Sequence, residues 1–204
     1  TNLKIEIHGF YIQYGHVKND RDVLVVRELF SKKLKEIKLD GLTFFEQVYL
    51  HQCYVWYYYI LLNFDKCMVD AKKWVDIFEE NPEMKKEEPD LYMRGQHYLL
   101  TCLFNLKMVK EFNKAINHFE KFEKEFGSEM KPVSEIIYFL YYSTSKLNKH
   151  YLEGTFKKGI EYVPEVLGKI KQHESHLDPH RILVFYYKIA FQYFGNENYN
   201  TMID

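Results

Sequence analysis

Three histidines near the end of the chain have a spacing that could support metal-binding chemistry. The group comprises His173, Glu174, His176, Asp178 and His180. Spacings of three and four residues place side chains on one face of a helix, and imidazoles together with a carboxylate can bind zinc. Pro179, however, breaks a helix before the third histidine, and the sequence differs from the HExxH arrangement of metalloproteases. We therefore expect a solvated loop here, with a metal site as the alternative.

Other catalytic chemistry has no recognisable pattern in this sequence. It has no GxSxG nucleophile motif, no glycine-rich phosphate loop and no paired cysteine motif. Six further histidines are scattered along the chain, at positions 8, 16, 51, 97, 118 and 150. Neighbouring acidic and basic residues, as in 84–88, are typical of a solvated loop. We therefore predict that the protein is not an enzyme and uses no cofactor.

The composition restricts the class of partner. The 204 residues include 28 Lys and Arg against 29 Asp and Glu, a formal net charge of −1, so the basic excess that binds nucleic acid is missing. The richest apolar stretch, 53–62, is about ten residues long and too short to cross a membrane. Three widely spaced cysteines indicate buried thiols in a reducing compartment. We therefore expect a cytoplasmic protein whose partner is a protein or peptide, without direct contact to nucleic acid or membrane.

The elements that carry these residues are predicted to be helices throughout. Apolar residues recur at steps of three and four, and only 9 Gly and 5 Pro interrupt the chain. We predict one all-α domain over residues 1–204, with helical hairpins at about 2–38, 43–80, 89–126, 132–172 and 179–204, the last incomplete. The fourth hairpin is expected to consist of helices 132–147 and 150–172. Pro164 lies inside its second helix, where we expect a kink or a short break.

A similar linker recurs between the longer helices. Each linker contains an aromatic residue, namely Phe64, Phe112, Tyr151 and Tyr199, at separations of 48, 39 and 48 residues. Three residues later, the first three linkers carry the small residues Cys67, Ala115 and Gly154, although Leu152, Thr155 and Gly159 fit the third linker equally well. An aromatic residue that fills the turn and a small residue where two helices cross closely are both required in stacked helical hairpins.

This pattern resembles the tetratricopeptide repeat (TPR) family. The best unit consists of Phe64, Cys67, Ala71 and Trp74, followed by Pro82, and the second consists of Phe112, Ala115, Phe119 and Phe122. The spacing of 39–48 residues is longer than the family's period of about 34, and Trp74 and Phe122 are large where the family prefers alanine. The resemblance covers about 43–204. It implies a right-handed α-solenoid of stacked antiparallel helical hairpins with degenerate repeats.

The resemblance also implies a concave peptide-binding surface on the first helix of each hairpin. Its positions are Tyr49, Gln52, Trp56 and Tyr59 in the first unit, His97, Leu100, Phe104 and Lys107 in the second, and Ile136, Phe139, Ser143 and Lys146 in the third. Tyrosine and tryptophan are frequent at interaction hot spots, although tyrosines also fill the interior of long stacked helices. The column of Lys and Asn that binds chaperone tails in this family is missing, so we do not expect that ligand.

Two functional hypotheses remain open at this stage. The first is a protein-interaction module, part of a larger regulatory or scaffold protein. The second is a structural spacer or oligomerisation element without a dedicated ligand groove. The helix at 179–194 is apolar on more than one face, and a further helix begins near Asn198. We therefore expect the chain to be a fragment of a longer solenoid, with self-association through the C-terminal hairpin when the next helix is missing.

Overall fold

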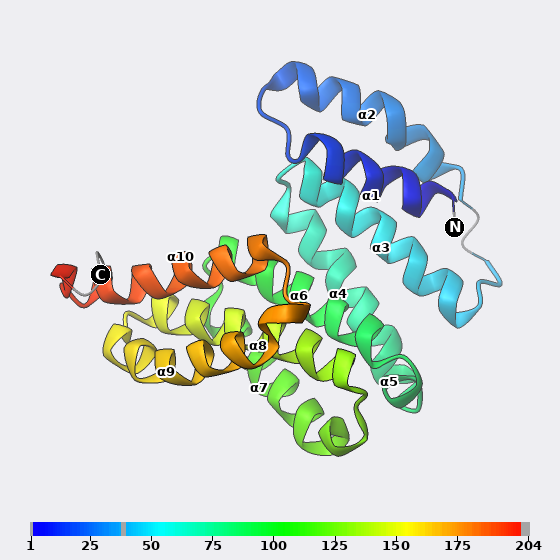
Figure 1. The fold of residues 1–204 in the computed structure, drawn as a ribbon. Helices are drawn as coiled ribbons and strands as arrows, with labels where there is room; N and C mark the ends of the chain where they lie inside the picture. The colour runs from blue at the N-terminus through cyan, green and yellow to red at the C-terminus, as the bar shows by residue number, and fades with distance from the viewer. Residues whose placement is uncertain (1, 38–39, 201–204) are drawn as a thin grey trace. The chain divides into compact units, whose positions relative to one another are not determined.

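The computed structural model describes residues 2–37 and 40–200 and shows an all-helical chain (Figure 1). Helix accounts for 85% of the structure, and the described residues include no strand. The α-helices are α1 (Asn2–Tyr14), α2 (Asp20–Lys35), α3 (Phe44–Ile60), α4 (Phe64–Glu80), α5 (Met84–Glu87), α6 (Pro89–Asn105), α7 (Val109–Phe126), α8 (Pro132–Glu153), α9 (Phe156–His173) and α10 (Pro179–Gly195). The predicted all-α class is confirmed. None of the described helices is both long enough and apolar enough to span a membrane.

The chain divides into two compact units. The first is Thr1–Leu106 and contains α1 to α6, and the second is Lys107–Asp204 and contains α7 to α10. The predicted hairpin at 89–126 is therefore divided between the units. The single domain over 1–204 stays a prediction, and each unit is described by itself.

The helix ends follow local sequence signals. Thr43 caps α3 in a reciprocal capping box, because the backbone N–H of Glu46 donates to Thr43 Oγ1 (3.4 Å) and the backbone N–H of Thr43 donates to Glu46 Oε2 (2.9 Å). Prolines begin α6, α8 and α10, where a missing N–H is harmless. Local chemistry thus accounts for where α3, α6, α8 and α10 begin.

The predicted boundary between helices 132–147 and 150–172 is wrong. Helix α8 continues to Glu153, so Tyr151 lies in its last turn and not in a linker. The helix ends instead at Gly154, which adopts the left-handed conformation with φ of 65°. Glycine takes this conformation without the clash that a Cβ causes, whereas residues 148–153 contain nothing that stops a helix. Gly154 is exposed and is not at a helix crossing.

Pro164 does not break its helix. Helix α9 runs through it from Phe156 to His173. The proline side chain is exposed, while Tyr162 and Val163 beside it are buried. Water can therefore satisfy the backbone carbonyl that loses its partner one turn earlier, and packing of the opposite face maintains the helix.

In the first unit, consecutive helices pack antiparallel. Near the start of α3, the ring of Phe44 contacts Phe78 at the end of α4 (5.0 Å between centroids). Near the end of α3, the carbonyl of Val55 accepts a hydrogen bond from Cys67 Sγ at the start of α4 (3.4 Å). Cys67 and Ala71 are fully buried, so small residues lie where these two helices are close, as predicted for Cys67.

Helix α6 also packs against α4. The indole of Trp74 is fully buried against Gly95, where an added Cβ would lie 3.2 Å from the indole ring. Phe78, one turn later on α4, meets Tyr92, one turn earlier on α6 (5.5 Å). The two helices therefore run in opposite directions. Both tryptophans of the chain, Trp56 and Trp74, belong to this unit.

The second unit has its own core between α8, α9 and α10. The buried cluster comprises Phe139, Leu147, Tyr162, Val163, Val166, Ile170, Leu177, Phe185 and Ile189. Helices α9 and α10 are close at Gly159, where the side chain of buried Gln192 occupies the space of a missing Cβ. Gln192 Nε2 donates to the carbonyl of Leu147 (3.0 Å), so one side chain links all three helices.

Candidate functional site

Three helices of the first unit, α1, α3 and α6, run in the same direction. Residues of α1 contact residues of α3 in the same order along both helices. Lys4 contacts Tyr49, His8 contacts Trp56 and Tyr11 contacts Tyr59. Helices α3 and α6 are each antiparallel to α4 and are therefore parallel to each other. These three helices form a common face, with α3 in the middle.

The centre of this face is a row of three stacked or bonded side chains. The imidazole of His8 stacks on the indole of Trp56 (4.2 Å between centroids, 22° between planes). Trp56 Nε1 donates to the hydroxyl of Tyr98 on α6 (2.7 Å). The ring of Tyr98 also contacts Tyr59 (5.6 Å). Each of α1, α3 and α6 thus contributes one residue to this row.

The predicted groove positions of the first unit divide into buried and accessible ones. Trp56 and Gln52 are buried, with 4% and 0% exposure, so neighbouring helices cover them. Tyr49 and Tyr59 are half-buried, and burial raises the pKa of Tyr59 well above its ordinary value. Ligand contact through Tyr49 and Tyr59 stays a prediction.

The second predicted set does not share one unit. Leu100 is buried in α6, and His97 and Phe104 on the same helix are half-buried. Lys107 is exposed and belongs to the second unit. The groove role of these four residues stays a prediction.

The second unit contains an open pocket of about 390 Å³. It lies among α7, α8 and α9. Its lining includes the acidic residues Glu120, Glu123, Glu135 and Glu165, the aromatic residues Tyr138, Phe139, Tyr142 and Tyr162, and the basic residues Lys124 and Lys169, together with Ser143, Gln172 and His173. Tyr138 and Tyr142 lie one turn apart on α8 and stack at 5.2 Å, almost parallel. Carboxylates therefore outnumber lysines around a set of tyrosine rings.

The carboxylates make this pocket electronegative. The hydroxyl of Tyr142 donates to Glu120 Oε1. Burial first, and then Glu120, raises the pKa of Tyr142 far above its ordinary value, and burial with Glu123 and Glu120 does the same for Tyr138. Burial raises the pKa of Tyr162 to about 12, although its hydrogen bond with Ser143 partly opposes the rise. Ionisation of these tyrosine hydroxyls beside the carboxylates is thus disfavoured.

The third predicted set lies in and around this pocket. Phe139 and Ser143 line it, and Ser143 Oγ is hydrogen-bonded to the hydroxyl of Tyr162 on α9 (2.8 Å). Lys146 places its ammonium 3.8 Å from the centroid of the Tyr162 ring, a cation–π geometry. Ile136 packs against the core cluster of the unit. The predicted positions lie on α8, and the contributions of α7 and α9 were not predicted. The three tyrosines among residues 138–142 are the signal in the sequence that could have pointed to this pocket.

The histidine cluster of the sequence analysis is not gathered around one point. His173 ends α9, and His176 lies in the short 3₁₀ turn that follows it. Within residues 2–37 and 40–200, no three His, Cys, Asp or Glu side chains are arranged to hold a metal ion. His173 instead lines the pocket and approaches the ring of Phe139 (6.0 Å).

One histidine that looked isolated in the sequence has a carboxylate partner. His51 Nδ1 lies 2.8 Å from Asp70 Oδ1, and both side chains are largely buried between α3 and α4. A histidine oriented by an aspartate is one part of a hydrolytic site, but no serine or cysteine bonded to His51 completes it in the described chain. The pair therefore joins two helices.

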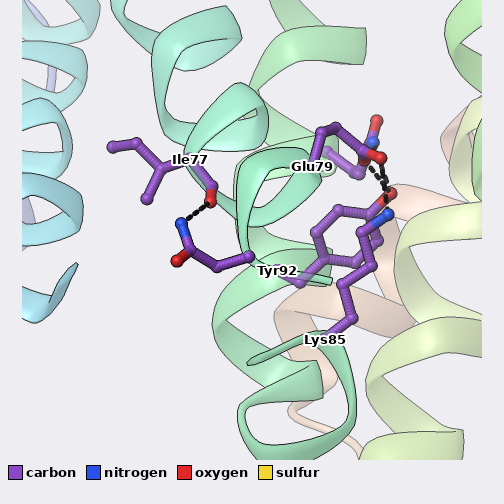
Figure 2. A network of polar contacts seen from close by, with 6 residues as sticks. Ile77, Glu79, Lys85 and Tyr92 are labelled. Atoms are coloured by element: carbon purple, nitrogen blue, oxygen red, sulfur yellow. Dashed lines mark hydrogen bonds and ion pairs between the residues drawn. The ribbon is translucent and has the colours of Figure 1, made fainter. Parts of the chain in front are cut away.

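Lys85, in the stretch 84–88 that was expected to form a solvated loop, belongs to a polar network (Figure 2). Residues 84–87 form the one-turn helix α5, and the ammonium of Lys85 lies 2.5 Å from Glu79 Oε2 on α4. Tyr92 on α6 donates to the other oxygen of Glu79 (3.2 Å) and accepts a hydrogen bond from Gln96 Nε2 (2.9 Å). Nearby, Asn81 Nδ2 donates a hydrogen bond to the backbone carbonyl of Ile77 at the end of α4 (2.8 Å). The network fastens α5 to both neighbouring helices.

Comparison with known proteins gives no match: no family model, no curated protein and no solved structure is similar to this chain. The function is therefore inferred from the two arrangements described above, the common face of the first unit and the pocket of the second.

Proposed function

We propose that this protein is an interaction module that binds a segment of another protein. The proposal includes the α-solenoid interpretation, in which hairpins stack in one right-handed array and the first helices of the hairpins line its inner face. The parallel arrangement of α1, α3 and α6 supports this interpretation for the first unit. The three buried, free cysteines are compatible with the reducing cytoplasm.

The observation that carries the proposal is the pocket of the second unit. Its volume of about 390 Å³ is within the usual range for sites that bind small ligands or single anchoring side chains. Stacked tyrosines give a rigid apolar wall at low entropic cost. The surplus of carboxylates favours a basic side chain, lysine or arginine, between the rings and Glu120 or Glu123. Lys146 already shows this cation–π contact within the chain itself.

A peptide-display selection tests the proposal. Random peptides are selected on the intact protein, and the enriched clones are then measured on two variants. Glu123→Lys reverses a charge in the pocket lining, whereas Glu125→Lys reverses an exposed charge on the same helix outside the lining. We expect enriched peptides to contain lysine or arginine, to bind Glu125→Lys unchanged and to bind Glu123→Lys at least about tenfold more weakly.

Two results would count against this function. If no peptide is enriched, the protein does not bind a linear segment under these conditions and the proposal fails. If enriched peptides bind Glu123→Lys as well as the wild type, the pocket is not the binding site.

One observation favours the second hypothesis, an oligomerisation element. Helix α10 exposes an uncharged stripe of large side chains at successive turns, namely Leu183, Tyr187, Phe191 and Phe194. Exposed apolar patches of this kind often mark contacts between proteins. Light scattering of the protein across a concentration series, compared with the variant Tyr187→Lys, tests this alternative. A mass that stays that of one chain at all concentrations excludes it.

A further inference from the structure

The common face of the first unit brings basic side chains from two helices to one place. Lys4 and His8 lie one turn apart on α1, and both contact α3. Trp56 on α3 contacts Tyr98 on α6, and the two helices are parallel. One turn earlier on each helix, Gln52 of α3 is therefore beside Arg94 of α6. Lys4 of α1 contacts Tyr49 of α3, and Arg94 is close enough to act on the charge of Lys4.

The basic side chains in this place, Lys4, His8 and Arg94, form no ion pair within the part of the chain that the structure describes. The nearest carboxylate on α6, Asp90, lies one turn before Arg94 and forms no ion pair with it. Burial lowers the pKa of both Lys4 and His8, and the nearby guanidinium of Arg94 lowers each further. All three basic side chains are only half-buried, so a ligand from solvent can reach them.

Gln52, one turn before Trp56 on α3, is an unsatisfied polar group. Its side chain has 0% exposure, and neither its Nε2 nor its Oε1 has a hydrogen-bond partner. Leaving such a group unpaired costs about 1–3 kcal/mol per missing partner. An apolar residue would pack here without that cost, so the amide is explained in part if a bound acceptor pairs with its Nε2 group.

We propose that Lys4, Gln52 and Arg94 bind a carboxylate of an acidic protein segment on the common face of α1, α3 and α6. A carboxylate accepts from the guanidinium of Arg94, the ammonium of Lys4 and the Nε2 group of Gln52. Arginine is suited to this task because its planar group pairs with both oxygens. The site is separate from the pocket of the second unit and has the opposite charge preference, so the two can be tested independently.

The histidine beside this site supplies a direct readout. A bound carboxylate compensates the charges of Lys4 and Arg94, and the pKa of His8 must then rise. We would follow the His8 ring by NMR across a pH titration of the intact chain, with an acetylated hexaglutamate peptide as the probe and sodium chloride added to match ionic strength. Inorganic phosphate in a parallel titration distinguishes a small free anion from a carboxylate-bearing segment.

The expected result is a saturable rise in the pKa of His8 with hexaglutamate. Arg94→Gln and, separately, Lys4→Gln should weaken this binding at least about tenfold, or about 1.4 kcal/mol, whereas Arg94→Lys should retain part of it. Lys72→Gln, which changes an exposed lysine on α4, is the control and should bind as the wild type does. Far-UV circular dichroism confirms that each variant is folded, and Lys4→Gln provides the test if Arg94→Gln does not fold.

Three results would overturn the proposal. The proposal fails if hexaglutamate leaves the pKa of His8 unchanged or if the folded variants bind it as tightly as the wild type. It also fails if phosphate alone saturates the site while hexaglutamate does not. The last result would assign the site to a free anion.

Discussion

Substitution of Gly159 by alanine tests the packing of the second unit most directly. In the middle of an exposed helix this change stabilises by up to about 1 kcal/mol, because alanine restricts the unfolded backbone more than glycine does. At Gly159 the new methyl group would lie 2.7 Å from Cδ and 3.1 Å from Cγ of Gln192, and closer still to Oε1. These distances are shorter than van der Waals contact, so Gln192 has to move.

The cost follows from what Gln192 does. Its side chain is 1% exposed and donates to the carbonyl of Leu147 at 3.0 Å. Overpacking of a buried site costs about 1–3 kcal/mol, and loss of the hydrogen bond costs about 1 kcal/mol more. After subtraction of the gain in helix propensity, Gly159→Ala should lower the free energy of unfolding by about 1–3 kcal/mol.

Gly168 on the same helix provides the matched control. An added Cβ at this exposed position has no atom within 4 Å, so Gly168→Ala should leave stability unchanged or raise it by up to about 1 kcal/mol. Urea unfolding followed by far-UV circular dichroism measures both variants. Equal stability of the two alanine variants would show that α9 and α10 are not as close as the structure has them. Partial recovery in the double variant Gly159→Ala with Gln192→Ala would identify Gln192 as the source of the clash.

Three further predictions concern buried side chains. Trp56→Ala should lower the free energy of unfolding by about 3–5 kcal/mol in urea titrations, because the indole is 4% exposed between His8 and Tyr98; a loss below about 1 kcal/mol would contradict its role in the core. Gln52→Leu should raise the melting temperature, because it removes an unpartnered buried amide, and should at the same time weaken hexaglutamate binding, because the Nε2 donor is lost. Stability should also fall above pH 10, because the hydroxyl of Tyr162 ionises near 10 when unfolded but holds its proton up to about 12 when folded. Each such tyrosine contributes a slope of about 1.4 kcal/mol per pH unit in this range, and Tyr162→Phe should reduce the slope of unfolding free energy against pH.

The sequence predicts those parts of the fold that depend on local chemistry. Helical periodicity is set by neighbouring residues, and the structure confirms the all-α class that it predicts. The prolines that begin α6, α8 and α10 and the cap at Thr43 are equally local features. The boundary between α8 and α9 was misplaced because the polar residues at 148–150 resemble a linker, whereas only Gly154 has the conformational freedom that ends the helix. The helix α5 was missed because its stability depends on Glu79 of another helix.

The candidate sites were harder to predict for a related reason. Periodicity shows that Trp56 is on an apolar face, but it does not show that His8 of α1 covers that face. The pocket of the second unit combines Glu120, Tyr142 and Tyr162 from three helices, and no spacing along the chain joins them. Sequence reasoning located the α8 contribution, through Phe139 and Ser143, and tertiary packing determined the remainder.

The distribution of tryptophan gives each half of this chain its own spectroscopic signature. Both indoles are buried in the first unit, while the second has tyrosine as its strongest chromophore. Fluorescence excited at the red edge of the protein absorption band therefore reports only on residues 1–106, and far-UV circular dichroism reports on both halves. If the two signals change at the same denaturant concentration, the halves unfold as one cooperative body. Two separate transitions would show instead that a partner could melt or order one half while the other stays folded.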